Sequence, residues 1–159
     1  DDFITHLSKE EINQKIEYFL IHFKDNWDVI QLTTVFKKLE DIDNIDHIKK
    51  VKSATTSSGY IIQAHFYDQL LSTLKESVFK MEQEMEIWLK NNNNDKKKKQ
   101  TGYALDQYWR HLQRESKWYI FYPYLGKQGG KAGKSSIMGK IGAEHFKMNH
   151  TIKLAIIHI

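Results

Sequence analysis

The stretch Lys117 to Ser136, KWYIFYPYLGKQGGKAGKSS, combines residue types that could bind a phosphate group. Glycines let the backbone approach a ligand closely, and backbone amides together with lysines suit an anion. Gly133, Lys134 and Ser135 form the GKS ending of a nucleotide-binding P-loop. The full pattern also requires a glycine five residues before Gly133, where this chain has Gln128. Binding of a phosphate or nucleoside triphosphate by this segment is therefore kept as an alternative only.

Other chemistry-bearing residues form no complete catalytic or metal-binding signature. His145 and His150 are five residues apart, so they would not share one helix face as paired ligands do. The acidic segment that begins at Asp41 lacks the calcium-loop pattern, because Ile45 and Asp46 stand where an oxygen ligand and a glycine are needed. The chain has no cysteine, which excludes thiolate metal sites and disulfides. We expect no metal, no cofactor and no catalytic residue.

Positive charge is concentrated in the C-terminal part of the chain. Residues 91–159 carry 13 Lys and Arg against 4 acidic residues, whereas residues 1–50 carry 7 against 11. Such a basic region attracts polyanions, and aromatic rings beside it can stack on bases. We therefore predict a non-enzymatic module that binds nucleic acid or another polyanion. The candidate binding residues are Arg110, Arg114, Trp118, Lys127, Lys131, Lys134 and Lys140, with Tyr122 and Tyr124 as further candidates for stacking.

Residues 107–153 resemble a nucleic-acid-binding family in the order of their features. Two aromatic segments are followed by LGKQGGKAG and a helix-like tail. This order is similar to the WGR domain of some DNA-dependent poly(ADP-ribose) polymerases, whose Trp-Gly-Arg motif and following glycine contact nucleic-acid ends. Gly126, Lys127 and Gly129 would take the Gly-Arg-x-Gly positions, whereas Leu125 replaces the signature Trp and Lys127 replaces the Arg. The resemblance implies nucleic-acid binding without enzymatic activity.

The N-terminal part has the spacing of apolar residues that is typical of helices. Ser8 and Glu11 fit a capping box, which predicts a helix that continues to Phe23. Similar spacing predicts a second helix over about 27–40, a short acidic helix over 42–51 and a loop over 53–59. The strongest pattern predicts one long helix over 60–90. A stripe of Met and aromatic residues along it is typical of the spine of a helical bundle.

The C-terminal part favours strands around its aromatic residues. Residues 118–124 combine four aromatics with an isoleucine before the only proline, which predicts a strand. Residues 105–115 fit either a helix or the first strand of a hairpin, and the sequence leaves both open. The predicted fold is α+β and mainly α. It comprises an N-terminal helical bundle with a long central helix and a small basic region with aromatic strands and a Gly/Lys-rich loop.

The low-complexity run NNNNDKKKKQ marks the boundary in this scheme. We predict a helical region over 1–90, a linker or exposed loop over 91–100 and a basic region over 101–159, with a single compact domain as the alternative. A helical region that binds a protein partner is the alternative function. No apolar run has the length of a membrane span, and the N-terminus lacks the layout of a signal peptide. An intracellular protein, nuclear or cytoplasmic, is therefore expected.

Overall fold

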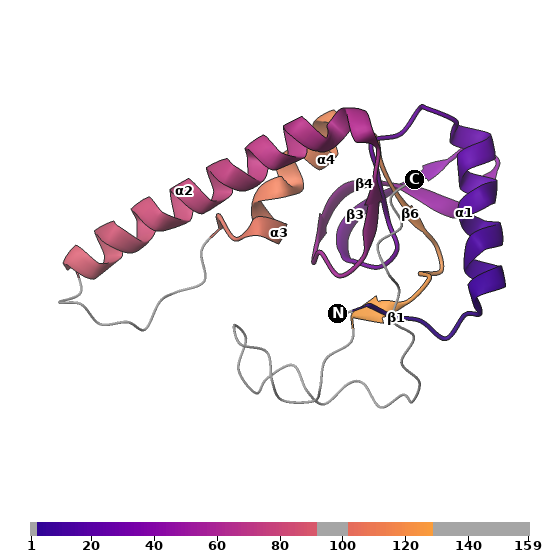
Figure 1. The fold of residues 1–159 in the computed structure, drawn as a ribbon, viewed down its shortest axis with the longest axis horizontal. Helices are drawn as coiled ribbons and strands as arrows, with labels where there is room; N and C mark the ends of the chain where they lie inside the picture. Colours follow the sequence, from indigo (N-terminus) through magenta and orange to yellow (C-terminus); the bar gives the residue numbers. More distant parts are fainter. Residues whose placement is uncertain (1–2, 92–101, 129–159) are drawn as a thin grey trace.

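A computed structural model describes residues 3–91 and 102–128 of the chain (Figure 1). Its centre is a five-stranded mixed sheet with strand order β3-β4-β6-β2-β5, and a two-stranded sheet joins β1 to β7. Strands β2 and β6 are parallel, and the other pairs are antiparallel. The strands are β1 (Phe3–Ile4), β2 (Val29–Gln31), β3 (Val35–Ile42), β4 (Ile45–Thr55), β5 (Tyr60–Ile62), β6 (Trp118–Phe121) and β7 (Lys127–Gln128).

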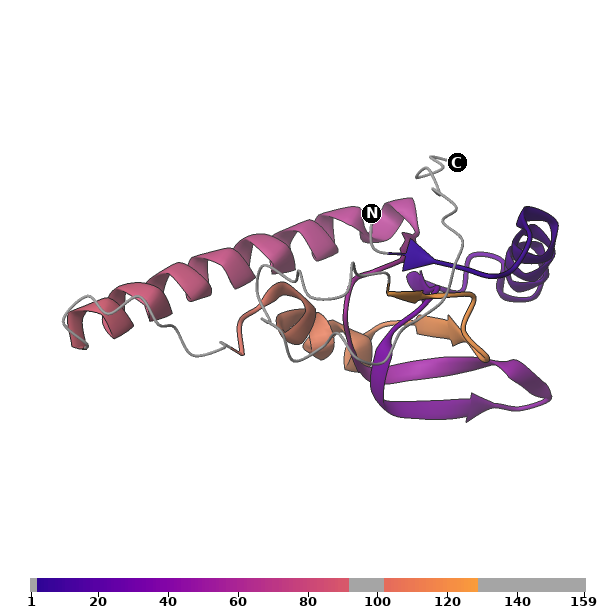
Figure 2. The ribbon, with the colours of Figure 1, turned by 90° about the horizontal axis from the view of Figure 1, so that it is seen from below.

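Helices cover both faces of the larger sheet. One face packs on α1, and the other packs on η1, α2, η2 and α4. In Figure 2, α2 extends well beyond the sheet, with α3 and α4 beside it. The helical elements are α1 (Lys9–Phe23), η1 (Ala64–Phe66), α2 (Tyr67–Asn91), α3 (Leu105–Tyr108), η2 (Trp109–His111) and α4 (Leu112–Glu115).

Strand β6 is the centre of the fold because it is buried on both sides. Trp118 and Ile120 belong to the apolar cluster beneath α2, whereas Tyr119 and Phe121 belong to the cluster beneath α1. This division follows from the alternation of side chains along a strand. Since β6 lies between β4 and β2, segments on both sides of residues 92–101 build one sheet. The described ranges therefore form one domain.

The predicted N-terminal helical bundle is wrong. The segment expected as a helix over 27–40 contains β2 and most of β3, and the short helix over 42–51 lies largely in β4. Ile42, Ile45 and Ile48 pack on the α1 side of the sheet, whereas Val51 packs on the α2 side. A strand that buries residues on both faces produces apolar spacings that imitate a helical stripe. The loop expected over 53–59 is also shorter, since β4 continues to Thr55.

A tight turn produces the β3–β4 hairpin. Ile42 pairs with Ile45, so only Asp43 and Asn44 lie between the strands. Asn44 has φ 62°, a left-handed conformation that asparagine tolerates better than most residues. The ion pairs Lys49–Asp41 (2.6 Å) and Lys52–Glu40 (3.4 Å) then join the two strands. The charged residues of this segment therefore pair across two strands and not along a helix.

Several helix predictions are confirmed. Ser8 caps α1: its hydroxyl accepts from the Glu11 amide (3.1 Å), and its own amide donates to the Glu11 carboxylate (2.7 Å). The long helix is α2, although it begins at Tyr67 because residues 60–62 form β5. Residues 105–115 take the helical alternative. The aromatic strand begins at Trp118 as expected and ends at Phe121, before Pro123.

Candidate nucleic-acid interface

The predicted stacking residue Trp118 is part of the core. Its exposed fraction is 0%, and its ring meets Trp109 edge-on at 5.1 Å between centroids. Phe66 packs on it as well, at 6.4 Å. The proposal that Trp118 stacks on a base is therefore incompatible with this fold, because the ring already fills the space between the sheet and the α2 side.

The predicted cationic residues lie on different elements. Arg110, on η2, is half-buried and donates from Nε to the Ser53 hydroxyl (2.9 Å), which ties the helical segment to β4. Arg114 is exposed on α4, one turn further along. Lys127 is half-buried on β7, which pairs with β1. Three further candidates lie outside the described residues: Lys131, Lys134 and Lys140.

The glycine assigned to the WGR-like motif has a local structural role. A Cβ atom at Gly126 would lie 2.5 Å from the Ile4 carbonyl oxygen and 2.6 Å from a Phe3 ring carbon. The chain therefore needs glycine here so that β7 can lie against β1. Close packing of the two strands accounts for Gly126 without a ligand.

The structure brings together a different set of aromatic rings, from both halves of the sequence. Phe36 of β3 is 45% exposed, and Tyr122, just after β6, is 46% exposed. The ring of Tyr124 lies between them, 6.3 Å from Phe36 and 6.2 Å from Tyr122, with both contacts edge-to-face. We call these three residues the aromatic patch. Tyr122 and Tyr124 are stacking candidates from the sequence; Tyr122 is exposed and Tyr124 is half-buried, whereas Trp118 is fully buried.

Backbone contacts with β4 fix the positions of the patch residues. Phe36 pairs with Ala54 in the β3–β4 ladder, and the Tyr122 amide donates to the His47 carbonyl (2.9 Å). Tyr124 also packs against the core beneath α2. Burial removes hydration from the Tyr124 hydroxyl, and this is the main cause that raises its pKa above the usual value; the neighbouring Tyr122 is a smaller cause. The Tyr124 hydroxyl is therefore neutral at physiological pH. The patch is thus a preformed aromatic surface.

One cation lies directly at the patch. The Lys49 ammonium is 5.8 Å from the centroid of the Tyr122 ring, within the range of a cation–π contact. Its hydrogen bond to Asp41 is the main cause that raises the pKa of Lys49, so the charge persists at neutral pH. The Asp41 side chain is 87% exposed, whereas the Lys49 side chain is 18% exposed, so solvent reaches this ion pair from the Asp41 side. A phosphate oxygen could replace the carboxylate at Lys49.

The surplus of positive charge lies entirely outside the described ranges, which carry 15 Lys and Arg against 16 acidic residues. Residues 92–101 and 129–159 carry 9 Lys against 2 acidic residues.

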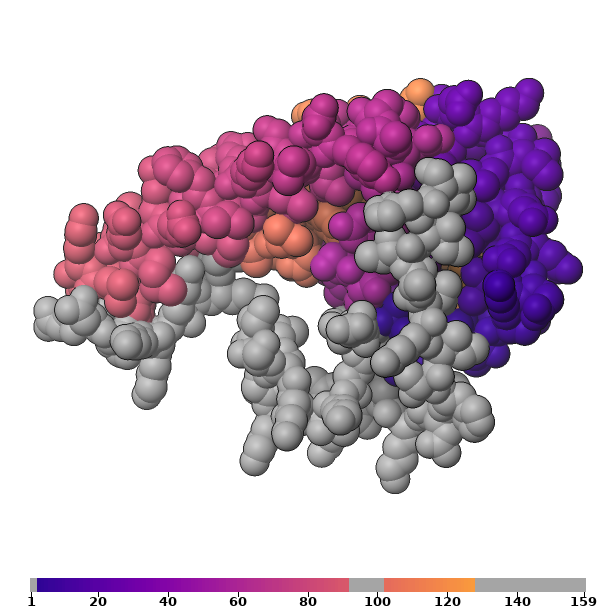
Figure 3. Space-filling model, in the orientation of Figure 1, coloured from indigo at the N-terminus to yellow at the C-terminus, as the bar shows by residue number. Residues whose placement is uncertain are grey.

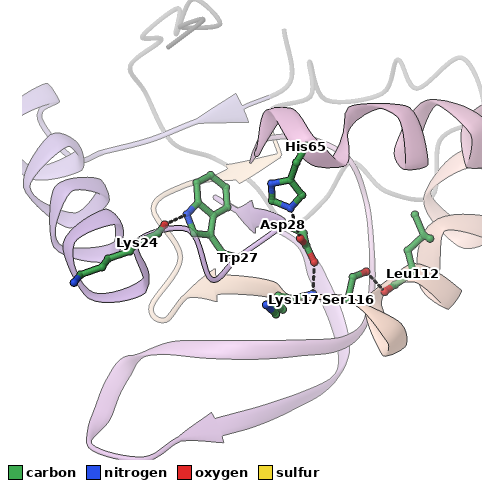
Figure 4. Close-up of polar contacts among 7 residues, drawn as sticks. All are labelled: Lys24, Trp27, Asp28, His65, Leu112, Ser116 and Lys117. Carbon is green, nitrogen blue, oxygen red and sulfur yellow. Dashed lines mark hydrogen bonds and ion pairs between the residues drawn. The ribbon is translucent and has the colours of Figure 1, made fainter.

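A second polar cluster surrounds Asp28, and its contacts are those of a structural junction (Figure 4). The Asp28 carboxylate bonds His65 Nε2 (2.7 Å) and accepts from the Lys117 amide (2.7 Å). Its backbone also bonds Lys117 and Gln63, which joins the ends of β2, β6 and β5. The Ser116 hydroxyl donates to the Leu112 carbonyl and not to His65, so Ser116, His65 and Asp28 do not form a catalytic triad. We assign this cluster to stability.

Metal chemistry and membrane insertion find no support in the described part of the chain. Residues 3–91 and 102–128 contain no group of three or more His, Asp or Glu side chains arranged to hold a metal ion. No helix within these ranges is both long and apolar enough to cross a bilayer.

Comparison with known proteins identifies no relative. No family model, curated protein or solved structure matches the chain. The resemblance to WGR domains therefore stays a prediction.

Sequence reasoning missed Phe36 and Lys49. Phe36 lies in the segment predicted as a helix over about 27–40, and Lys49 lies in the segment predicted as a short acidic helix over 42–51. The signal that could have located them is the polar dipeptide Asp43-Asn44, because both residue types tolerate the left-handed conformation that a tight turn requires. That assignment would have placed both residues on strands.

Proposed function

We propose that this protein binds single-stranded nucleic acid without catalysing a reaction. In this proposal bases stack on the aromatic patch, and lysines in the C-terminal part of the chain neutralise the phosphates. The observation that carries the proposal is the exposed pair of rings at Phe36 and Tyr122, joined through Tyr124 and accompanied by the Lys49 ammonium.

The form of the patch favours single strands over duplexes. An exposed ring face stacks on an unpaired base, whereas paired bases in a duplex present only their edges. Stacking also tolerates any base, because every base has a π-face. We therefore expect weak sequence preference. Affinity should decrease as salt increases, since cations displaced from the phosphates are released on binding.

Replacement of a patch ring tests the stacking component. Tyr122→Ala should weaken the binding of a fluorescent oligothymidylate about fivefold or more, because each stacked base contributes roughly 1–3 kcal/mol. Tyr67→Ala is the matched control, since Tyr67 is 47% exposed on α2, a helix that contributes no residue to the patch. Fluorescence anisotropy with the full chain gives both dissociation constants. Equal affinities for the two variants would exclude the patch as the binding surface.

Replacement of lysines tests the electrostatic component separately. A variant with alanine at four lysines should bind with a weaker salt dependence; the lysines are Lys127, Lys131, Lys134 and Lys140. The slope of log affinity against log salt concentration should become less steep by about 3, because each phosphate contact on a single strand contributes roughly 0.7 to it. Tyr122→Ala should leave this slope unchanged. An unchanged slope in the lysine variant would show that other residues contact the phosphates.

A further inference from the structure

Helix α2 carries a second apolar surface on the side away from its own core. Its core side holds the buried residues Leu70, Thr73 and Ser77. On another side, Leu71, Val78 and Phe79 are 49%, 44% and 58% exposed. Figure 2 shows α3 and α4 along one side of α2 and no described element along the opposite side. In the space-filling view α2 forms one long margin of the molecule (Figure 3).

The exposed apolar residues and two charged residues form one continuous strip. Side chains three or four positions apart are neighbours on a helix surface, so the strip runs from one end to the other without a gap. We call it the outer face of α2, and its members are Leu71, Lys75, Val78, Phe79 and Glu82. Neither charged member has an ion-pair partner among the described residues. The ion pair within α2 joins Lys80 to Glu76 instead (2.8 Å).

The positions of Lys75, Val78, Phe79 and Glu82 are symmetric about one point of the helix, whereas Leu71 of one copy would face the exposed Glu86 of the other. Lys75 and Glu82 are equally distant from the midpoint between Val78 and Phe79, about 5 Å along the helix axis on either side. A two-fold axis through this midpoint places Lys75 of one copy beside Glu82 of the other, and the reverse. The same axis places Val78 against Phe79. A parallel arrangement would instead place Lys75 beside Lys75 and Glu82 beside Glu82.

We propose that the outer face of α2 binds a second copy of this chain, with the two helices antiparallel and centred between Val78 and Phe79. This dimer gives a specific form to the protein-interaction function expected for residues 1–90, and it does not depend on nucleic-acid binding. A single pair of helices buries less than the roughly 1,200 Å² that is typical of stable complexes. The dimer is therefore concentration-dependent, and the two pairs of opposite charges select its register.

Charge reversal tests the predicted pairing. Lys75→Glu and Glu82→Lys should each weaken self-association of the full chain about tenfold, because each places like charges together at two symmetric positions. The double variant K75E/E82K should restore dimerisation. Lys9→Glu, the same charge change at an exposed site on α1, is the matched control. Sedimentation velocity from micromolar to near-millimolar concentration measures association, and circular dichroism verifies that each variant is folded.

Distances between labels test the orientation. Because the chain has no cysteine, one introduced cysteine carries a unique spin label. The antiparallel pair predicts axial separations of about 20 Å between labels at Ser72 and about 14 Å between labels at Gln83. A parallel pair predicts equal short distances at both sites. A chain that stays monomeric at every concentration, a double variant that fails to dimerise, or equal label distances would each overturn the proposal.

Discussion

Gln113 holds the helical segment 105–115 against the sheet, and its replacement by leucine should destabilise the protein strongly. The side chain is fully buried and forms two hydrogen bonds with the backbone of Ala54 in β4. The Ala54 amide donates to Gln113 Oε1 (2.7 Å), and Gln113 Nε2 donates to the Ala54 carbonyl (3.1 Å). The amide group thus extends the edge of β4 in the manner of an additional strand.

The expected loss of stability follows from the two backbone groups of Ala54 that would lose their hydrogen-bond partners. Leucine is close to glutamine in volume, so the cavity is small, but the Ala54 amide and carbonyl lose their partners while buried. Each unsatisfied buried group costs about 1–3 kcal/mol, so Gln113→Leu should lower the free energy of unfolding by about 2–6 kcal/mol. That loss is a large fraction of the roughly 5–15 kcal/mol typical of a domain.

Urea denaturation of Gln113→Leu measures this cost. Gln69→Leu is the control, because it makes the same substitution at an exposed site on α2.

Gln113→Glu adds a pH test. The neutral acid can donate to the Ala54 carbonyl, whereas the buried carboxylate faces it with another acceptor, so the pKa of this Glu is raised in the folded state. Its stability should therefore decrease as pH rises above about 4.3, the unfolded value. A Gln113→Leu variant as stable as the control would refute this account of the clamp.

Three further predictions concern the ends of elements. Gly126→Ala should lower the free energy of unfolding by about 1–3 kcal/mol, and hydrogen exchange should show faster opening of the β1–β7 pair. Ser8→Ala should cost about 1 kcal/mol in urea denaturation, because it removes the α1 cap. The Ser8 amide, and to a lesser extent the Ser8 side chain, lowers the pKa of Glu11, so wild-type stability from this group is lost as pH falls through that pKa. Ser8→Ala keeps the amide and should therefore retain most of this acid dependence. Asp28→Ala should cost about 1–3 kcal/mol in the same assay and leave His65 without its partner.

The sequence was sufficient for elements whose pattern is local. The capping box at Ser8 and Glu11 located α1, and the long apolar stripe located α2, because both signals lie within a few helical turns. The aromatic run likewise predicted β6 from its composition. Each of these segments contains enough information to specify its own conformation.

The sheet could not be predicted because its order depends on contacts between distant segments. Strand β6 inserts between β2 and β4, so the burial of Val29 and Ile48 depends on residues about 70 to 90 positions later. For the same reason the burial of Trp118 and the exposure of Tyr122 were indistinguishable in sequence. Both belong to one aromatic run, and the position of β6 alone assigns the first to the core and the second to the surface.

The most direct test of the proposed function is a comparison of single-stranded and duplex ligands with the wild-type chain. Binding of a labelled oligothymidylate and of a duplex of equal length is measured by fluorescence anisotropy at several salt concentrations. The aromatic patch predicts tighter binding of the single strand at every salt concentration, with affinity for both ligands decreasing as salt increases. Equal affinity for the duplex, or no binding of the single strand at low salt, would contradict the proposal.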